Sequence, residues 1–154
     1  MNRNEFQNLC NQIADEVERL LPIYLQIPIE VSSYKEGSAI AIMNEQGEAC
    51  GRVFGNKLSR QRECALTAWK KANQVWLTGY ATGQFETLVY SKQIDENQFS
   101  LSRPEYIGWI GGLEGTTLSG ERLILAFSGM QGEQDVAILK EAAKNLKSFT
   151  VLDW

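Results

Sequence analysis

The stretch FSGMQGEQDVAILKEA, residues 127–142, has a strand pattern followed directly by a helix pattern. Small and polar residues join the two, and glycine accepts unusual backbone torsions or the close approach of another group. Glu133 and Asp135 fall in the first helical turn, where negative charge complements the helix dipole. The stretch therefore predicts a strand, a turn and a helix over about 133–147. Ser128 and Gly129 at the turn either serve the turn alone, which is the preferred interpretation, or line a ligand cleft.

Three further segments have apolar residues at the spacing of a helix. Asn4 and Ser59 are the expected N-caps of the first two, Pro22 is expected to end the first, and Gly79 suits the left-handed position beyond the second. The three predicted helices span residues 4–21, 59–78 and 86–91.

Strands are predicted where β-branched residues gather between turn-forming residues. The order of helices and strands indicates an α+β domain, with an antiparallel sheet of about five strands and helices packed mainly on one face. The length fits one domain over residues 1–154. The polar segment 92–105 is expected to be a long loop. The predicted strands are 23–33, 38–44, 106–115 and 121–129, with a further candidate at 48–54.

The charge and composition exclude several classes of function. A net charge of −4 and a pI near 5.0 disfavour binding to nucleic acid, which needs clustered Lys and Arg. The first residues have acidic side chains throughout, unlike a signal or transit peptide, and no stretch approaches the roughly 20 apolar residues that span a membrane. We expect a cytoplasmic protein without a nucleic-acid or membrane partner.

The cysteine and histidine counts limit the chemistry further. Cys10, Cys50 and Cys64 are odd in number and lack a C-x-x-C spacing, which favours buried thiols over a zinc site or a disulfide framework. The chain has no histidine, which excludes Ser-His-Asp and Cys-His catalysis, histidine metal sites and a proximal-histidine haem ligand. No nucleophile with its base can be identified, so an enzyme is the less favoured prediction.

Three segments of the chain resemble the GlcG/HbpS-like family of haem-binding and haem-degradation-associated domains, which includes the C-terminal domain of PduO-type cobalamin adenosyltransferases. The segments are RECALTAWKKA (62–72), WIGGLEG (109–115) and LAFSGMQGEQDVAILKEAA (125–143). The last is the most specific, because a small-residue strand end before a Glu-Gln-Asp helix opening is typical of the family. The resemblance implies a profilin-like α+β fold, a homo-oligomer and haem as a cofactor.

This sequence departs from the family pattern at two places. The family often has a Gly-Gly-x-Pro bend, where this chain has Gly111-Gly112-Leu113-Glu114. It often has a lysine in the central helix, at a position that Ala65 takes here. With the missing histidine, these departures mean that the fold transfers better than the function.

Basic residues gather before and within the first turn of the predicted central helix: Arg52, Lys57, Arg60 and Arg62. The free amides of a helix start favour anions, so propionates or a phosphate could bind there, although a solvated helix start explains the same charges. The glycines at 108, 111, 112 and 115 match neither phosphate-loop pattern, and a tight bend explains them better.

The sequence gives weaker signals for iron ligands and for a subunit interface than for the anion site. Without histidine, iron would need Tyr, Cys or Met, and each of these is more often a core or rim residue. Trp69 and Trp76 fall on one face of the central helix, where they would belong to the core or to a subunit interface. The candidate iron ligands are Tyr80, Tyr90, Tyr106 and Cys64.

The sequence thus predicts a small-molecule binding domain, with haem or another tetrapyrrole as the ligand class. The alternative is a structural or protein-interaction module that keeps the fold as an oligomer and has lost the site. A third hypothesis, an enzyme acting on an anionic metabolite, requires the cations of 52–62 to converge on one cleft. No catalytic or metal-binding residue is predicted. The predicted cofactor-binding residues are Arg52, Arg60, Arg62, Gly111, Gly112, Ser128 and Gly129.

Overall fold

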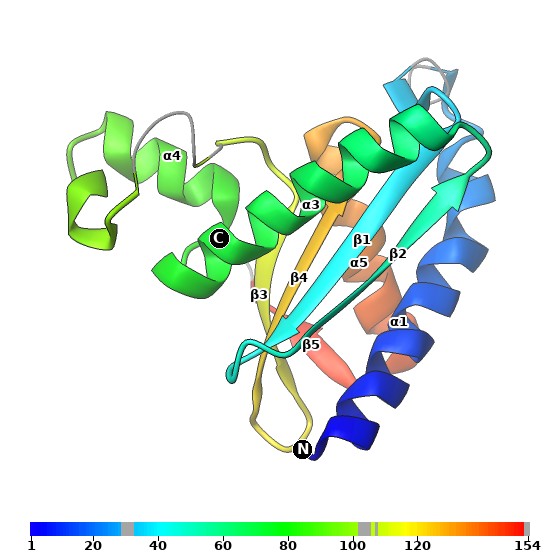
Figure 1. Cartoon of the computed structure of the whole chain (residues 1–154), viewed down its shortest axis with the longest axis horizontal. Coiled ribbons are helices and arrows are strands. Elements are labelled where there is room, and N and C mark those ends of the chain that lie inside the picture. The colour runs from blue at the N-terminus through cyan, green and yellow to red at the C-terminus, as the bar shows by residue number, and fades with distance from the viewer. Residues whose placement is uncertain (29–32, 102–105, 107, 153–154) are drawn as a thin grey trace.

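The fold is taken from a computed structural model, which describes residues 1–28, 33–101, 106 and 108–152. Helices and strands follow one another along the chain in nearly the predicted order (Figure 1). The elements are α1 (Arg3–Tyr24), β1 (Gly37–Asn44), β2 (Ala49–Gly55), α3 (Leu58–Thr78), α4 (Thr82–Tyr90), η1 (Glu96–Phe99), β3 (Gly112–Thr117), β4 (Arg122–Ser128), α5 (Gly132–Leu146) and β5 (Phe149–Val151).

The five strands form one antiparallel sheet in the order β2-β1-β4-β3-β5. At its centre Ala41 of β1 lies opposite Ala126 of β4, and Gly112 of β3 lies opposite Ala126 on the other side. The predicted α+β class and five-stranded antiparallel sheet are confirmed. Residues 149–151, for which no strand was predicted, pair with β3 and complete the sheet.

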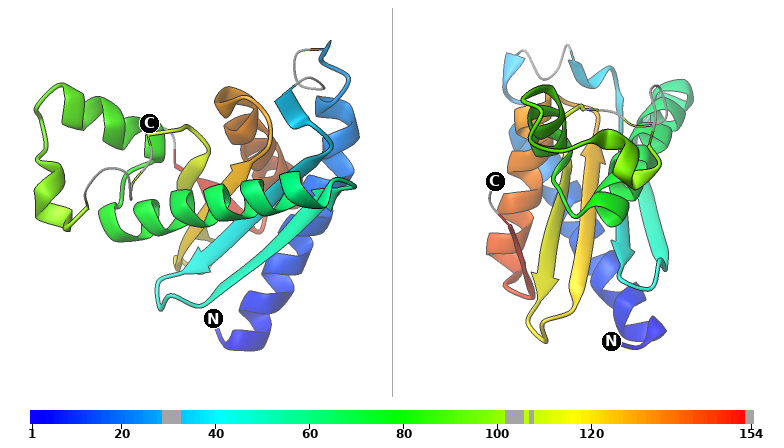
Figure 2. Two further views of the ribbon diagram at one scale, coloured as in Figure 1. Left: turned by 45° about the horizontal axis from the view of Figure 1, so that its top comes forward. Right: turned by 90° about the vertical axis from the view of Figure 1, so that its left-hand side faces the viewer.

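Helices cover both faces of the sheet, which corrects the expectation that they lie mainly on one. Ile40 and Ile42 point into a core formed with α1 and α5, whereas Ala39 and Ala41 point into a second core formed with α3. Figure 2 shows α5 and α3 on opposite sides of the sheet in its right-hand view. The physical reason is that β1 is buried at every position, so both faces need a cover.

The first helix begins and ends outside its predicted bounds. Asn2, not Asn4, is the N-cap, in a capping box with Glu5. Pro22 lies inside α1 rather than ending it, because Leu21 is buried and Tyr24 packs against the same core. The predicted strand 23–33 is therefore wrong over its first residues, which continue the helix to Tyr24. Residues 29–32 of that prediction lie outside the described residues.

The central helix α3 matches its prediction closely. It ends at Thr78, with Gly79 left-handed at φ +73°, as expected. Its N-cap is Lys57 rather than Ser59, and no side-chain hydrogen bond caps it. The short helix predicted at 86–91 starts earlier, at Thr82. The expected loop 92–105 contains the 3-10 turn η1, and residues 102–105 are outside the described part of the chain.

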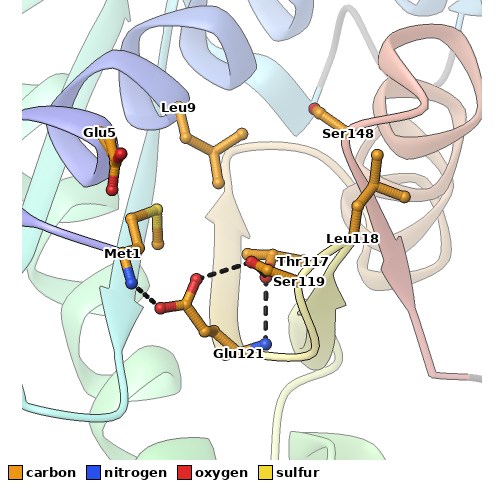
Figure 3. Close-up of a pocket in the computed structure, with 8 residues that line it drawn as sticks. All are labelled: Met1, Glu5, Leu9, Thr117, Leu118, Ser119, Glu121 and Ser148. Atoms are coloured by element: carbon orange, nitrogen blue, oxygen red, sulfur yellow. Dashed lines mark hydrogen bonds and ion pairs between the residues drawn. The ribbon is translucent and has the colours of Figure 1, made fainter.

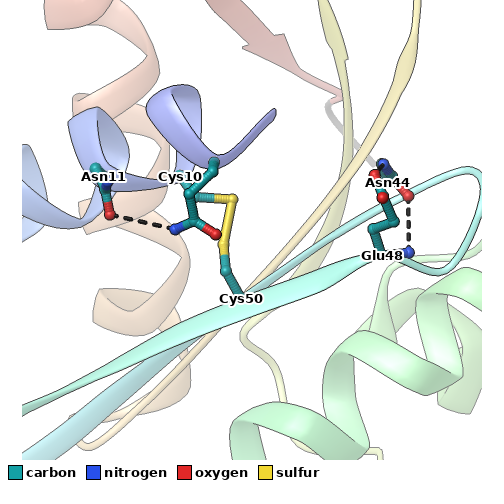
Figure 4. Close-up of a disulfide and its surroundings, with 6 residues drawn as sticks. Cys10, Asn11, Asn44, Glu48 and Cys50 are labelled. Carbon is teal, nitrogen blue, oxygen red and sulfur yellow. Dashed lines mark hydrogen bonds between the residues drawn. A yellow bond between two sulfur atoms is a disulfide. The ribbon is translucent and has the colours of Figure 1, made fainter. Parts of the chain in front are cut away.

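A disulfide joins Cys10 of α1 to Cys50 of β2, contrary to the prediction of buried thiols for both (Figure 4). Their Cα atoms are 6.6 Å apart although 40 residues separate them, because α1 packs across the edge of the sheet at β2. Cys64 is the buried free thiol that was expected. Burial raises the pKa of the Cys64 thiol, so its neutral form is favoured.

Among the described residues, no helix has the length and apolarity that crossing a membrane requires. The same residues contain no group of three or more Cys, Asp or Glu side chains that could hold a metal ion.

Candidate ligand-binding site

A cavity of about 610 Å³ lies where β4 ends and α5 begins. Its walls come from residues 128–133 of the β4–α5 connection, from α3, from Glu86 of α4 and from residues 108–110. Figure 1 shows how α3 passes the end of β4 beside this connection. We call it the Lys71 cavity, after the lysine that lines it from α3. It adjoins the turn that the sequence marked as a candidate cleft.

A buried ion pair lies beside this cavity. Lys71 Nζ is 3.0 Å from Asp135 Oδ2 and donates a second hydrogen bond of 2.8 Å to the carbonyl oxygen of Phe127. The other oxygen of Asp135 accepts from the amide of Met130 at 3.0 Å. The two side chains are only 2% and 3% exposed. A charge buried this far from water needs an opposite charge beside it, and Lys71 and Asp135 supply this to each other. The first turn of α5 is a place where an acidic residue is usually exposed, but Asp135 is buried.

Gly111 makes room for this ion pair. Its φ of +133° is a conformation that residues with a side chain rarely adopt, and a Cβ there would lie 2.6 Å from the carbonyl oxygen of Phe127. The same Cβ would collide with the ammonium of Lys71. The next residue, Gly112, starts β3, and its amide donates to the hydroxyl of Thr82 at 3.2 Å. The two glycines therefore lead into a strand, where the sequence predicted a strand that ends in a bend.

The predicted site residues are only partly brought together. Arg60, Ser128 and Gly129 line the Lys71 cavity, and Gly111 borders its ion pair. Arg52 lies on the other face of the sheet, 2.5 Å from Asp15 of α1. Arg62 is an exposed residue of α3 and does not line this cavity.

The cations of 52–62 thus do not converge, which removes the condition for the enzyme hypothesis. Residues two apart on a helix point in different directions, which separates Arg62 from Arg60 on α3. Arg52 lies on β2 instead, and β2 and α3 direct Arg52 and Arg60 to opposite faces of the sheet. Arg60 itself is already engaged, at 3.2 Å from Glu63 Oε2 and 3.2 Å from the carbonyl oxygen of Ser33.

The candidate iron ligands lie outside the cavity lining. Tyr80 packs against Phe85 and Phe99, and Tyr106 donates a hydrogen bond to Glu96. Tyr90 is exposed, and the Cys64 thiol contacts the carbonyl oxygen of Gly37. None of the four lines the Lys71 cavity.

Sequence reasoning missed several residues that line this cavity, among them Lys71, Glu86 and Trp109. A signal for Lys71 was present, because it lies three residues after Ala68 and four before Val75, on the buried face of the helix. A lysine at such a position needs a buried acidic partner. Glu86 and Trp109 carried no comparable signal.

A second cavity, of about 550 Å³, lies between the start of α1 and the β3–β4 turn (Figure 3). Leu9 and Leu118 form apolar parts of its wall. The amine of Met1 pairs with the carboxylate of Glu121 at its edge, and Glu121 also accepts a hydrogen bond from Ser119. No predicted site residue lines this cavity.

Comparisons with known proteins give the fold a name. No protein-family profile and no curated protein sequence match the chain. The solved structure of a PduOC:haem complex is similar, with a TM-score of 0.61 at 15% identity, covering 94% of this chain and 93% of that one. The Klebsiella pneumoniae protein ORFY gives a TM-score of 0.61 at 16% identity, over 90% and 88% of the two chains.

HbpS is also similar, with a TM-score of 0.56 at 13% identity over 87% of this chain and 86% of that one. Identities this low establish a shared fold. This protein has the GlcG/HbpS-like fold that the three sequence segments indicated.

Proposed function

We propose that this protein is a small-molecule binding domain and that its ligand occupies the Lys71 cavity. The observation that carries this proposal is the cavity itself, about 610 Å³ beside Ser128 and Gly129, within the size range of small-molecule sites. Ile110 and Met130 supply apolar contacts, and charged side chains supply polar ones. A site that had closed would have side chains filling this space.

The similarity in fold makes haem the first ligand to consider, since one similar structure is a PduOC:haem complex. The described lining of the Lys71 cavity fits iron coordination poorly. It has no tyrosine or cysteine, the chain has no histidine, and Met130 alone in this lining is of the remaining ligand type. The haem propionates would also lack a free cation in this lining, since Lys71 and Arg60 already pair with carboxylates. We therefore expect haem to find no specific site here.

A titration with haemin tests this expectation directly. Following the Soret band and tryptophan quenching, we expect no saturable one-to-one change. A saturable one-to-one shift of the Soret maximum would contradict it and establish a tetrapyrrole as the ligand class.

The general proposal is tested by a small-molecule screen on 15N-labelled protein. We expect binders that move the amide signals of residues 128–132 and 108. Thr67→Trp should abolish these shifts, because Thr67 lines the cavity and the larger ring fills it. Lys70→Trp is the matched control on the exposed side of α3. Shifts that persist in Thr67→Trp, or a screen without binders, would overturn the proposal.

A second candidate function is an interaction module that forms a homo-oligomer. Trp69 and Trp76, predicted for the core or a subunit interface, are partly buried, and the Trp76 indole donates to the carbonyl oxygen of Glu45. Leu66 of α3 and Val53 of the edge strand β2 are exposed instead, at 66% and 46%. Light scattering should then give a multiple of 17.3 kDa, and Leu66→Glu should lower it. A monomer at every concentration would contradict this function.

A further inference from the structure

Glu86 lies in the wall of the Lys71 cavity, and its carboxylate has no partner among the described residues. It is partly buried, and no hydrogen bond or ion pair joins it to any residue in the described part of the chain. Lys71 of α3 and Asp135 of α5 also line the cavity, but they neutralise each other, so Lys71 does not compensate the charge of Glu86. An uncompensated carboxylate at the edge of a low-dielectric cavity attracts positive charge.

The carboxylate of Glu86 lies directly against the chain beside Trp109. A Cβ on Gly108 would be 2.5 Å from Glu86 Oε1, so the glycine permits this close approach. The next side chain, Trp109, also lines the cavity and is 68% exposed. An indole is the aromatic surface over which a cation is held most strongly. A carboxylate and an exposed indole therefore face the same cavity from neighbouring positions.

The charged side chains that line the cavity are also negative on balance, which favours a positively charged ligand. Glu86, Glu133 and Asp135 supply three carboxylates, whereas Arg60 and Lys71 supply two cations. Lys71 is paired with Asp135, and Arg60 contacts Glu63 from outside the lining. Glu86 and Glu133 remain as the charges that a ligand would meet.

We propose that the Lys71 cavity binds an organic cation, a protonated amine or a guanidinium group, through Glu86 and Trp109. The cation forms a charge-assisted hydrogen bond with the Glu86 carboxylate and packs against the Trp109 indole. The apolar remainder of the ligand lies toward Ile110 and Met130, which line the same cavity. This inference rests on the proposed small-molecule function and names the ligand class.

Three probes of similar size test it: n-butylammonium, n-butanol and butyrate, each titrated into 15N-labelled protein. We expect n-butylammonium to shift the Trp109 indole signal, assigned with Trp109→Phe, and the Gly108 amide. A dissociation constant on the order of millimolar is expected for so small a ligand. Glu86→Gln should weaken binding roughly five- to tenfold, whereas Glu18→Gln, on α1 across the sheet, should leave it unchanged.

The outcomes separate this inference from the function on which it rests. If n-butanol or butyrate shifts the same signals as strongly as n-butylammonium, the cavity binds small molecules and the preference for a cation is wrong. If n-butylammonium binds equally well to the Glu86→Gln variant, Glu86 is not its partner and the inference is also wrong. If none of the three probes moves a cavity signal, both the inference and the proposed site are overturned.

Discussion

Lys71 of α3 and Asp135 of α5 form an ion pair, 3.0 Å from Nζ to Oδ2. It lies beyond the end of β4 and joins α3, on one face of the sheet, to α5, on the other face. The carbonyl oxygen of Phe127, next to the end of β4, takes part in the same contact. The pair thus fixes three elements that together shape the cavity.

Breaking this pair should destabilise the protein strongly. Lys71→Met removes the ammonium that faces the buried Asp135 carboxylate, and removing one partner of a buried ion pair typically costs about 3–5 kcal/mol. Urea denaturation measures this loss, and Lys70→Met, one residue away and exposed, is the matched control, with an expected change within about 0.5 kcal/mol. Adding Asp135→Asn to Lys71→Met should cost less than the sum of the single changes. Equal stability of Lys71→Met and the unaltered protein would contradict the structure at this point.

Gly111→Ala should disturb the same region through the backbone. The new Cβ would require a rare φ and would lie 2.6 Å from the Phe127 carbonyl oxygen, beside the ammonium of Lys71. We expect a loss of more than about 2 kcal/mol in the free energy of unfolding. Gly120→Ala is the control, because its φ is also positive, at +85°, but no atom lies within 4 Å of the new Cβ. Its loss should be about 1 kcal/mol. Similar losses in both variants would show that Gly111 is not sterically confined.

Removing the disulfide should lower stability without changing the cavity. A cross-link between Cys10 and Cys50, 40 residues apart, is worth about 2–4 kcal/mol. Cys10→Ala with Cys50→Ala, or a thiol reductant, should shift the urea midpoint down by a corresponding amount. Cys64→Ala should leave this response to reductant intact. Alkylation of both Cys10 and Cys50 in unfolded, unreduced protein would show that the cross-link is absent.

The Cys64 thiol predicts a change of stability at alkaline pH. Burial raises its pKa in the folded state above the ordinary value of 9.0. The folded protein therefore holds this proton more tightly than the unfolded chain, so the contribution is complete below pH 9 and is lost as pH rises through the folded pKa. The free energy of unfolding should fall between pH 8 and pH 10 by less in Cys64→Ala than in the unaltered protein. Parallel profiles would contradict a raised pKa.

Much of the fold follows from local signals. The helix after Gln131 and the strand before Ser128 lie where the sequence predicted them, because apolar periodicity and turn residues act over a few positions. The end of α1 was mispredicted since the packing of Tyr24 on the core outweighs the break that Pro22 suggests. In such a case tertiary packing overrides local preference.

The candidate site was predicted less well. Ser128, Gly129 and Arg60 were identified and do line the Lys71 cavity, but Arg52 was grouped with them and lies across the sheet. Arg52 is eight residues from Arg60 in the chain, and proximity along a chain does not tell which face of the sheet a side chain occupies.

By itself, the sequence determined the α+β class, the order of most elements and the turn at Ser128 and Gly129, because these depend on neighbours in the chain. Only the tertiary structure decided that Cys10 meets Cys50, that Lys71 meets Asp135, and that Glu86 lies against Gly108. Each of these contacts joins residues more than 20 positions apart. They are set by strand register and by the packing of helices on both faces of the sheet, which no short stretch of sequence contains.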